Sequence, residues 1–372
     1  MNEHDTPRVA PSVNRRTRQR RPKLRIGITG LDARENAYPG LALARALKEA
    51  YGPRAVTVAL TYNIECTGIY CRSAIDEIRL SPYPSDQEDI WLKFYRGLQS
   101  IAPIDVLFPA LDTEIPVHAR IADELRKIGI RTLLPSERVV KARGKLALLH
   151  TCQRLGIPTP RTVALNDLGQ LDILFESFSY PVYLKASVVD ARKASNVDEA
   201  RFHYLQLLER WGYPILVQQG IAGEEYDVVA LADRDSELVG AMPIKKFGIT
   251  ARGKAFSGVA LDAPDLLEQA ADMLRKLRWV GPCELELMKE ASTGIYHVLE
   301  INARFPAWAY FTAPAGMNLI ATALELALDE EPGSLAPYRR DGIYFRNVMT
   351  EIEPLGRFAR LMTGQSWPEG EV

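Results

Sequence analysis

Cysteine and histidine are too scarce and too scattered in this sequence to predict a structural metal site. No pair of CxxC motifs occurs among its four cysteines, Cys66, Cys71, Cys152 and Cys283. Structural zinc and a disulfide framework are therefore both disfavoured. The five histidines are also widely spaced, and His297 shares its predicted strand face with Leu299. That position favours a packed or supporting side chain over a metal ligand.

Long hydrophobic runs and an excess of charge of either sign are also missing. No apolar run approaches the length of a membrane-spanning helix, and the N-terminus lacks the apolar core of a signal peptide. The composition is 47% hydrophobic and 25% charged with a formal net charge of −1, which is ordinary for a globular protein. It gives no general case for membrane or nucleic-acid binding. We therefore expect a cytoplasmic protein of two or three compact units.

Residues 1–23 have few apolar side chains and cannot bury enough surface to fold alone. This basic tail carries a cluster of arginines, Arg15, Arg16, Arg18, Arg20 and Arg21. An arm for nucleic acid or for an acidic partner is one interpretation. A solvated, disordered tail is favoured, because no aromatic residue is interleaved with the charges.

Glycine is sparse where a dinucleotide-binding motif would need it, since the loop TGLDARENAYPG lacks the G-x-G-x-x-G pattern. From Leu24 onward, however, the strands LRIGITGL, AVTVALTY and IDVLFPAL alternate with helices. This alternation predicts a parallel sheet in an α/β domain, residues 24–135. Asp112 and Glu114 directly follow a strand, where ligands bind in open α/β sheets. Capping of the next helix explains the same two residues equally well.

Beyond Pro135 the sequence places basic side chains where they could meet an anion. Lys185 lies in the otherwise apolar strand YPVYLKA, and an unpaired ammonium there is costly to bury. A phosphate is a fitting partner, and a structural carboxylate is the alternative. Further along, the break QQGIAG between two strands offers backbone donors and acceptors to a flat ring. The loop region that follows carries four more cations, Lys245, Lys246, Arg252 and Lys254.

Carboxylates are concentrated in the predicted hairpin GPCELELMKEASTGIYHVLEINAR. Side chains alternate along a strand, so Glu284 and Glu286 share one face of its first strand. Glu300, Asn302 and Arg304 share a face of the second strand. Carboxylate and amide oxygens are preferred ligands of Mg²⁺. An exposed hairpin with a solvated charged face is the alternative, but the apolar, aromatic flank RFPAWAYFTAPAGMNL argues against it.

Four motifs, in this chain order, resemble the ATP-grasp superfamily, in particular carboxylate–amine ligases similar to carbamoyl-phosphate synthetase and biotin carboxylase. They are ARGKLALLH, YPVYLKA, VQQGIAGEEYDV and the hairpin. By this resemblance, Lys145 and Lys185 bind nucleotide phosphates, and Glu225 holds the ribose hydroxyls. The residues that match the contacts to the adenine edge are Gln218, Gln219 and Ile221.

The resemblance also identifies the hairpin as a metal site. The implied Mg²⁺ ligands are Glu286, Glu300 and Asn302. Arg304 matches the arginine of the E-x-N-x-R pattern that faces the transferred phosphate, and Glu284 becomes a supporting or substrate-side residue.

A cover that excludes water is expected from residues 245–257, where Lys245 would touch the transferred phosphate or the substrate.

The fold that the resemblance implies combines α/β and α+β architecture. A Rossmann-like, pre-ATP-grasp domain with a parallel sheet (24–135) would precede a two-subdomain ATP-grasp fold. We expect the small subdomain at residues 136–212. The large subdomain, with a C-terminal strand and helix, is expected at 213–372.

The implied activity is ATP-dependent formation of a C–N bond. A substrate carboxylate, from an amino acid or another small acid, would be phosphorylated, and an amine would attack the acyl phosphate, with release of ADP and phosphate. ATP and Mg²⁺ are the implied cofactors, with two metal ions expected and Mn²⁺ as a substitute, and a homodimer is left open. One alternative is activation of bicarbonate or carbamate, which the lack of a biotin-carrying or glutaminase segment disfavours. The other is a nucleotide-binding regulatory protein without catalysis.

One segment departs from the pattern of the superfamily. The segment SVVDARKASN after Lys185 lacks the glycines usual in a phosphate-covering flap, so either Arg192 and Lys193 supply side-chain contacts or the flap does less. The identity of the substrate is a separate question that the sequence leaves open. Three aromatic residues after Arg304 border the expected acceptor site and could equally be core residues: Trp308, Tyr310 and Phe311. Asp112 and Glu114 are candidates for binding a substrate amine.

Overall fold

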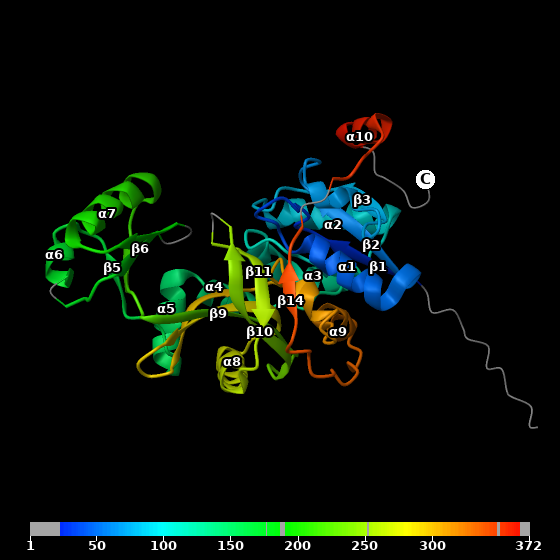
Figure 1. The fold of residues 1–372 in the computed structure, drawn as a ribbon. Helices are drawn as coiled ribbons and strands as arrows, with labels where there is room; N and C mark the ends of the chain where they lie inside the picture. Colours follow the sequence, from blue (N-terminus) through cyan, green and yellow to red (C-terminus); the bar gives the residue numbers. More distant parts are fainter. Residues whose placement is uncertain (1–22, 176, 187–189, 251–252, 348–349, 365–372) are drawn as a thin grey trace, which may run out of the picture.

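The computed structural model describes residues 23–175, 177–186, 190–250, 253–347 and 350–364. The basic tail, apart from Lys23, therefore lies outside the described residues. Three sheets form the framework, and Figure 1 shows the large sheet between an N-terminal unit and a small unit. This arrangement confirms the predicted mixture of α/β and α+β architecture. Over the described ranges, no helix is both long and apolar enough to cross a membrane.

The N-terminal unit is a parallel sheet, as the alternation of strands and helices predicts. In the strand order β3-β2-β1-β4, its members are β1 (Leu24–Ile28), β2 (Ala55–Thr61), β3 (Glu77–Leu80) and β4 (Val106–Phe108). The connecting segments are α1 (Gly40–Tyr51), η1 (Gly52–Arg54), η2 (Thr67–Tyr70), α2 (Glu88–Ile101) and α3 (Ile115–Lys127). Every residue of β2 is buried, as expected for a parallel strand covered on both faces.

The small unit is an antiparallel sheet with the strand order β5-β8-β6-β7. Its strands are β5 (Thr162–Leu165), β6 (Val182–Ala186), β7 (Ala191–Ala194) and β8 (Ile215–Gln219), and its helices are α6 (Gln170–Phe175) and α7 (Val197–Trp211). Helix α7 begins after Asn196, whose side chain accepts a hydrogen bond from the backbone N–H of Glu199. Strand β8 follows residue 212, so sheet membership extends the small unit through Gln219. The domain boundaries themselves stay a prediction.

The large unit is an antiparallel sheet with the strand order β13-β12-β9-β10-β11-β14. Its strands are β9 (Gly223–Ala232), β10 (Leu238–Ile249), β11 (Ala255–Ala260), β12 (Gly281–Glu290), β13 (Tyr296–Asn302) and β14 (Ile343–Phe345). The associated helices are α4 (Glu137–Ala142), α5 (Lys145–Leu155), α8 (Pro264–Leu277), η3 (Ala309–Thr312), α9 (Leu319–Ala327) and α10 (Leu355–Met362). Strand β14 and helix α10 are the expected C-terminal strand and helix.

The two faces of the large sheet differ in what covers them. Leu285 and Ile301 belong to a buried cluster with α4, α5 and α8. The opposite face, which includes Val229 and Leu231, packs in a cluster shared with α1, η3 and α9. Because side chains alternate along β12, Glu284 and Glu286 lie on this second face, towards the N-terminal unit.

Glu114 has a structural role in the N-terminal unit. Its side chain is buried and accepts hydrogen bonds from the Thr29 hydroxyl and from the backbone N–H groups of Ala110 (2.8 Å) and Leu111 (3.0 Å). Burial raises the pKa of the Glu114 carboxyl to about 7, against the opposing effect of these hydrogen bonds. Glu114 thus fixes the strand-to-helix turn after β4, which favours the structural interpretation over a substrate contact.

His118, one turn further along α3, gives the N-terminal unit a predictable sensitivity to acid. Its buried ring contacts the Tyr95 hydroxyl (2.7 Å) and the Glu114 carbonyl (2.9 Å), and burial lowers its pKa to about 4. The unfolded chain takes up a proton below about pH 6.5, but the folded chain does so only near pH 4. We expect this group to remove about 2 kcal/mol of stability between pH 7.5 and pH 5.

Urea unfolding of the protein and of His118→Gln at these two pH values measures the effect. The variant should lose about 2 kcal/mol less than the wild type on acidification, whereas His150→Gln, at an exposed position of α5, should behave like the wild type. The Glu114 carboxyl acts in the opposite direction, because its raised pKa makes stability fall as the pH rises from about 4.5 to 7. Equal acid sensitivity in wild type and His118→Gln would show that His118 does not carry it.

Candidate nucleotide and metal site

A row of carboxylates crosses three neighbouring strands of the large sheet. In the register of the sheet, Glu286 of β12 is opposite Glu300 of β13 on one side and Asp227 of β9 on the other. Directly paired residues project on the same face of a sheet. The hairpin therefore brings together the acidic residues that the sequence predicts, and the neighbouring strand adds Asp227, which the sequence reasoning missed. The available signal was its two-residue spacing from Glu225, which places both on one strand face.

Glu284 and Asn302 anchor the end of the row nearest the N-terminal unit. The Glu284 carboxylate accepts hydrogen bonds from the Arg304 guanidinium (2.8 Å), the Trp308 indole N–H (3.1 Å) and the Asn302 amide (3.3 Å). The same Asn302 amide nitrogen lies 3.4 Å from Glu286 Oε1. Glu284 is therefore fully engaged by its neighbours, which fits the supporting role expected of it.

Arg304 connects the hairpin to the N-terminal unit. Besides Glu284, it pairs with Asp112 Oδ2 (3.0 Å), whose Oδ1 accepts a hydrogen bond from Arg143 (3.0 Å). Burial acts to raise the pKa of Asp112, but the two guanidinium groups hold it below its ordinary value. Asp112 is thus an ionised partner of Arg304, and this pairing competes with the predicted contact to a substrate amine.

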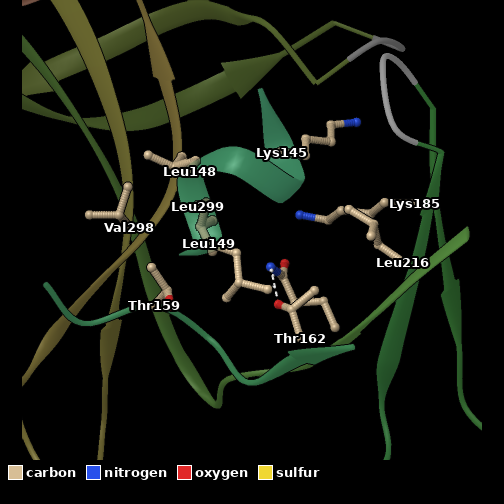
Figure 2. A pocket seen from close by; sticks show the side chains of 10 residues that line it. Lys145, Leu148, Leu149, Thr159, Thr162, Lys185, Leu216, Val298 and Leu299 are labelled. Atoms are coloured by element: carbon tan, nitrogen blue, oxygen red, sulfur yellow. Dashed lines mark hydrogen bonds between the residues drawn. The ribbon is translucent and has the colours of Figure 1, made fainter. Parts of the chain in front are cut away.

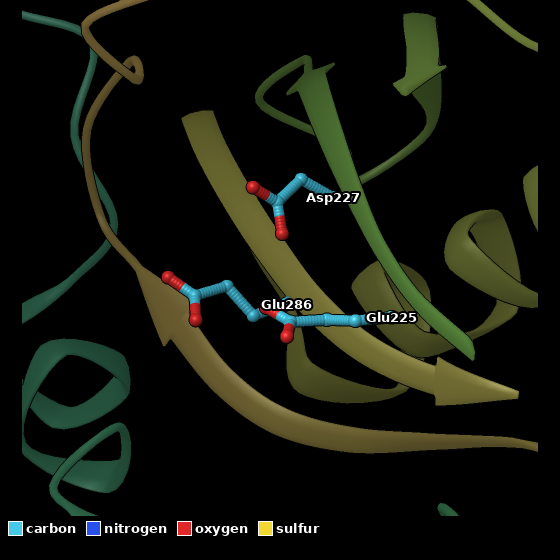
Figure 3. Close-up of side chains that lie close together, drawn as sticks. All are labelled: Glu225, Asp227 and Glu286. Carbon is cyan, nitrogen blue, oxygen red and sulfur yellow. The ribbon is translucent and has the colours of Figure 1, made fainter. Parts of the chain in front are cut away.

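Three carboxylates of β9 and β12 are close enough to share a metal ion. One oxygen from each of Glu225, Asp227 and Glu286 lies within 4.8 Å of the others, and Figure 3 shows the side chains converging. Lys246 of β10 contacts two of them, at 2.6 Å from Glu225 Oε1 and 3.2 Å from Asp227 Oδ1. The trio differs from the predicted ligand set in using Glu225 and Asp227 in place of Glu300 and Asn302.

The protonation of this cluster reflects its crowded negative charge. Burial, reinforced by the charges of Glu284, Glu300 and Glu225, raises the pKa of Glu286 to about 7. Burial also raises the pKa of Asp227 well above its ordinary value. Such like-charge repulsion is what a bound cation relieves. The oxygen-rich donor set suits a hard divalent ion such as Mg²⁺, so the residues present fit the implied metal.

Lys145 enters the same region from α5, and Lys185 enters it from β6 of the small unit. Figure 2 shows both side chains beside one pocket, and Lys145 Nζ lies 3.3 Å from the carbonyl oxygen of Ala186. Burial lowers the pKa of both ammonium groups, while the charges of Glu300 and Glu286 act in the opposite direction. Two partly buried cations thus face the carboxylate row, as expected for a site that receives phosphates.

A small pocket lies beside these lysines, between the small sheet and β13. Its apolar lining includes Leu148, Leu149, Leu216, Val298 and Leu299. A register shift in the β12–β13 ladder interrupts the alternation of side chains, so the two neighbours Val298 and Leu299 both line the pocket. The space is about 20 Å³, room for about one water molecule. The pocket is therefore too small, as the structure has it, for a nucleotide base.

The predicted adenine contacts divide between this pocket and its surroundings. Gln218 lines the pocket and donates to the Thr162 hydroxyl at 3.1 Å. Gln219 instead directs its side chain to the backbone of Ser179, from which it accepts a hydrogen bond at 3.1 Å. Ile221 is half-buried in the break between β8 and β9. Of the three, the structure brings only the Gln218 side chain into the pocket lining.

Lys245 is not brought into the carboxylate cluster. It forms an exposed pair with Glu224 at 2.6 Å on the opposite face of the sheet, because neighbouring residues of β10 project to opposite faces. Lys246 takes the inward position instead. In the expected flap, Arg192 pairs with Asp190 at 3.0 Å and Lys193 is exposed. Residues 187–189 of that flap and Arg252 lie outside the described residues.

Comparison with known proteins agrees with this fold. A family model described as "ATP-grasp in the biosynthetic pathway with Ter operon" matches residues 213–350. Phosphoribosylamine–glycine ligase of Arabidopsis thaliana (chloroplastic) is 25% identical over 220 residues, which are 52% of this chain and 41% of that protein. D-alanine–D-alanine ligase of Marinomonas sp. (strain MWYL1) is 29% identical over 163 residues, 40% of this chain and 51% of that protein. The chain thus matches about half or less of each curated relative.

Solved structures share the fold over most of the chain. The biotin carboxylase domain of Hydrogenobacter thermophilus 2-oxoglutarate carboxylase, determined with MgADP, ADP and bicarbonate, has a TM-score of 0.65 at 18% identity, covering 86% of this chain and 73% of that one. N5-carboxyaminoimidazole ribonucleotide synthetase, in an ADP complex, has a TM-score of 0.65 at 17% identity, with 85% and 79% covered. At these identities the likeness shows the fold alone.

Residues 213–350 thus match an ATP-grasp family model, and the solved structures share the fold over most of the chain. The resemblance inferred from its four motifs is thereby confirmed.

Proposed function

We propose that this protein is an ATP-dependent carboxylate–amine ligase that works through an acyl phosphate. A substrate carboxylate oxygen would attack the terminal phosphorus of ATP with loss of ADP, and an amine would then displace phosphate from the acyl carbon, losing its proton. The observation that carries the proposal is the carboxylate row of Asp227, Glu286 and Glu300 on three neighbouring strands. Lys145 and Lys185 line a pocket that also includes Leu299, the neighbour of Glu300 on β13. Phosphoryl transfer needs mainly positioning and charge neutralisation, and these residue types supply both.

Mg²⁺ would be held by carboxylates of the row, and it supplies charge neutralisation to the phosphates when bound. Glu286 belongs to both the predicted ligand set and the geometric trio, so we propose it as the central ligand. Glu300 and Asn302 flank it on the hairpin side, and Glu225 and Asp227 on the β9 side. Titration with Mg²⁺ and Mn²⁺ would separate one bound ion from the proposed two.

The chain's own cations would position the substrates. Lys145 and Lys185 would bind phosphate oxygens, and Arg304, fixed by Asp112 and Glu284, would present its guanidinium beside the transferred phosphoryl group. We assign the role expected of Lys245 to Lys246, because Lys246 contacts the carboxylate cluster and Lys245 does not. Light scattering of the purified protein would determine whether it forms the homodimer that the resemblance leaves open.

The test is a library of amino acids and small carboxylic acids, each incubated with ATP, Mg²⁺ and an amine mixture, with ADP, AMP and phosphate measured separately. Substrate-dependent release of ADP and phosphate is expected. Release of AMP and pyrophosphate would indicate adenylation and contradict the acyl-phosphate route. A parallel reaction with bicarbonate as the only acid distinguishes bicarbonate activation. ATP binding with no turnover on any acid would favour a regulatory protein.

A further inference from the structure

A second, larger cavity adjoins the carboxylate cluster. It measures about 610 Å³, within the roughly 300–1,000 Å³ usual for small-molecule sites. It lies between the start of α1, the segment 307–315 and the segment 339–347. Trp308 forms a common wall, because it lines the cavity and donates its indole N–H to Glu284 of the cluster. A ligand in this cavity would therefore border the proposed phosphoryl-transfer site.

The inner wall of the cavity is aromatic. The ring of Tyr344 stacks on Trp308, with centroids 6.1 Å apart and planes at 15°, and lies 5.2 Å from the Phe311 ring. Tyr38 contributes a further ring from the N-terminal unit. The Tyr344 hydroxyl is buried and has no hydrogen-bond partner among the described residues. Flat apolar groups pack favourably on such rings, and the hydroxyl remains as a donor for a polar atom of the ligand.

Arg346 gives the same cavity a cation without a carboxylate partner in the described part of the chain. Its guanidinium contacts only backbone carbonyls, those of Glu35 (3.4 Å) and Arg34 (3.3 Å), and packs 5.5 Å from the Phe256 ring. Burial lowers its pKa, against the opposing effect of Tyr344. A half-buried guanidinium in this state is suited to pairing with an anion from the ligand.

Lys254 is a second cation of this kind, next to the cavity wall. Its ammonium lies 5.0 Å from the centroid of the Tyr38 ring and 3.4 Å from the Asn36 carbonyl. Burial lowers its pKa, and the charges of Arg304 and Arg346 act in the same direction. The carboxylates of Glu284 and Asp112 act in the opposite direction. Lys254 therefore lies within range of the charges of both the cavity and the proposed catalytic site, and its ammonium would attract an anion bound at Arg346.

We propose that this cavity binds the carboxylic acid that the enzyme activates, and that this substrate is an aromatic carboxylic acid. Its carboxylate pairs with Arg346 and Lys254, and its ring packs against Trp308 and Tyr344. Among the described residues that line the cavity, three arginines stand against one acidic side chain: Arg45, Arg339, Arg346 and Asp341. The identification of this ligand as the substrate rests on the proposed ligase function, whereas the recognition of an aromatic carboxylate rests on the cavity alone.

Isothermal titration of the full-length protein without ATP tests the recognition. The probe is 3-phenylpropanoate, compared with 3-phenylpropanamide, which keeps the ring and loses the charge, and with propanoate, which keeps the charge and loses the ring. We expect the probe to bind at least about tenfold more tightly than either analogue. Equal affinity for the amide would overturn the role of the cations, and equal affinity for propanoate would overturn the role of the rings.

Variants distinguish ligand binding by Arg346 from a purely structural role, in which its guanidinium only holds the backbone of residues 34–35. Arg346→Gln and Lys254→Gln should each weaken 3-phenylpropanoate by about tenfold and leave the amide unchanged. Arg340→Gln is the matched control, because Arg340 lies in the same segment and pairs with Asp262 at 2.5 Å. If Arg346→Gln fails to fold, the affinity for 3-phenylpropanoate is measured with Arg346→Lys and Lys254→Gln instead. Unchanged affinity in the Arg346 variant and in Lys254→Gln would refute the proposal.

Failure of the ligase proposal would be visible separately. MgATP binding and ADP release are measured on the same preparations, with aromatic and aliphatic acids side by side. Probe binding with no ADP release from any acid would refute the ligase function and leave the recognition intact. ADP release that depends on aliphatic acids and not on aromatic ones would overturn the substrate class while the ligase function stands.

Discussion

Glu300→Gln is expected to lower ATP-dependent turnover by about a hundredfold or more while the fold stays intact. Glu300 is opposite Glu286 in the sheet, and its charge acts on Glu286, Lys145 and Lys185. Loss of a group that merely supports a metal ligand costs about 10- to 100-fold, so loss of a proposed ligand should cost at least as much. The change removes one negative charge from a repelling cluster, which should not destabilise the protein.

The measurement is the rate of ADP release at saturating ATP over a range of Mg²⁺ concentrations, with thermal unfolding as the check on folding. Glu290→Gln is the matched control, because Glu290 is a glutamate of the same hairpin whose carboxylate contacts Thr293 of the turn and His297 of β13. It should keep near wild-type turnover. Full activity of Glu300→Gln would remove Glu300 from the metal site and favour the trio of Glu225, Asp227 and Glu286.

Arg304→Met is expected to lower the free energy of unfolding by about 3 to 5 kcal/mol. The Arg304 guanidinium is 13% exposed and neutralises Glu284, which is 9% exposed, together with Asp112. Its removal leaves a buried carboxylate without its cation, and that desolvated charge is more costly than the loss of the pair. The same contacts join the N-terminal unit to the hairpin, so the change should also loosen that junction.

Urea unfolding at neutral pH measures the loss. Arg275→Met is the matched control, because Arg275 forms an exposed pair with Glu237 at 3.0 Å and should cost at most about 1 kcal/mol. The double variant Arg304→Met/Glu284→Gln should recover part of the loss, because the buried charge is gone. If Arg304→Met loses no more stability than Arg275→Met, or if the double variant recovers nothing, the assigned role of the Arg304–Glu284 pair is wrong.

The sequence was sufficient for the fold and for the hairpin because both depend on short-range periodicity. The alternation of strands and helices from Leu24 predicted the parallel sheet. The two-residue alternation placed Glu284 and Glu286 on one face and Leu285 and Ile301 in the opposite core. The motif order then selected Lys145 and Lys185, which line one pocket and stay predicted phosphate ligands.

Only the tertiary structure decided which side chains complete the site, because these depend on strand register and on long-range pairing. Asp227 joins the carboxylate row because β9 pairs with β12 in one register. Lys246, and not Lys245, faces inward because β10 presents alternate residues to the cluster. The 610 Å³ cavity forms from three segments far apart in the chain, and no local pattern could place Arg346 on the same wall as Trp308. Local periodicity therefore determined the scaffold, the motif order selected the lysines proposed to bind phosphate, and long-range packing determined the proposed substrate site.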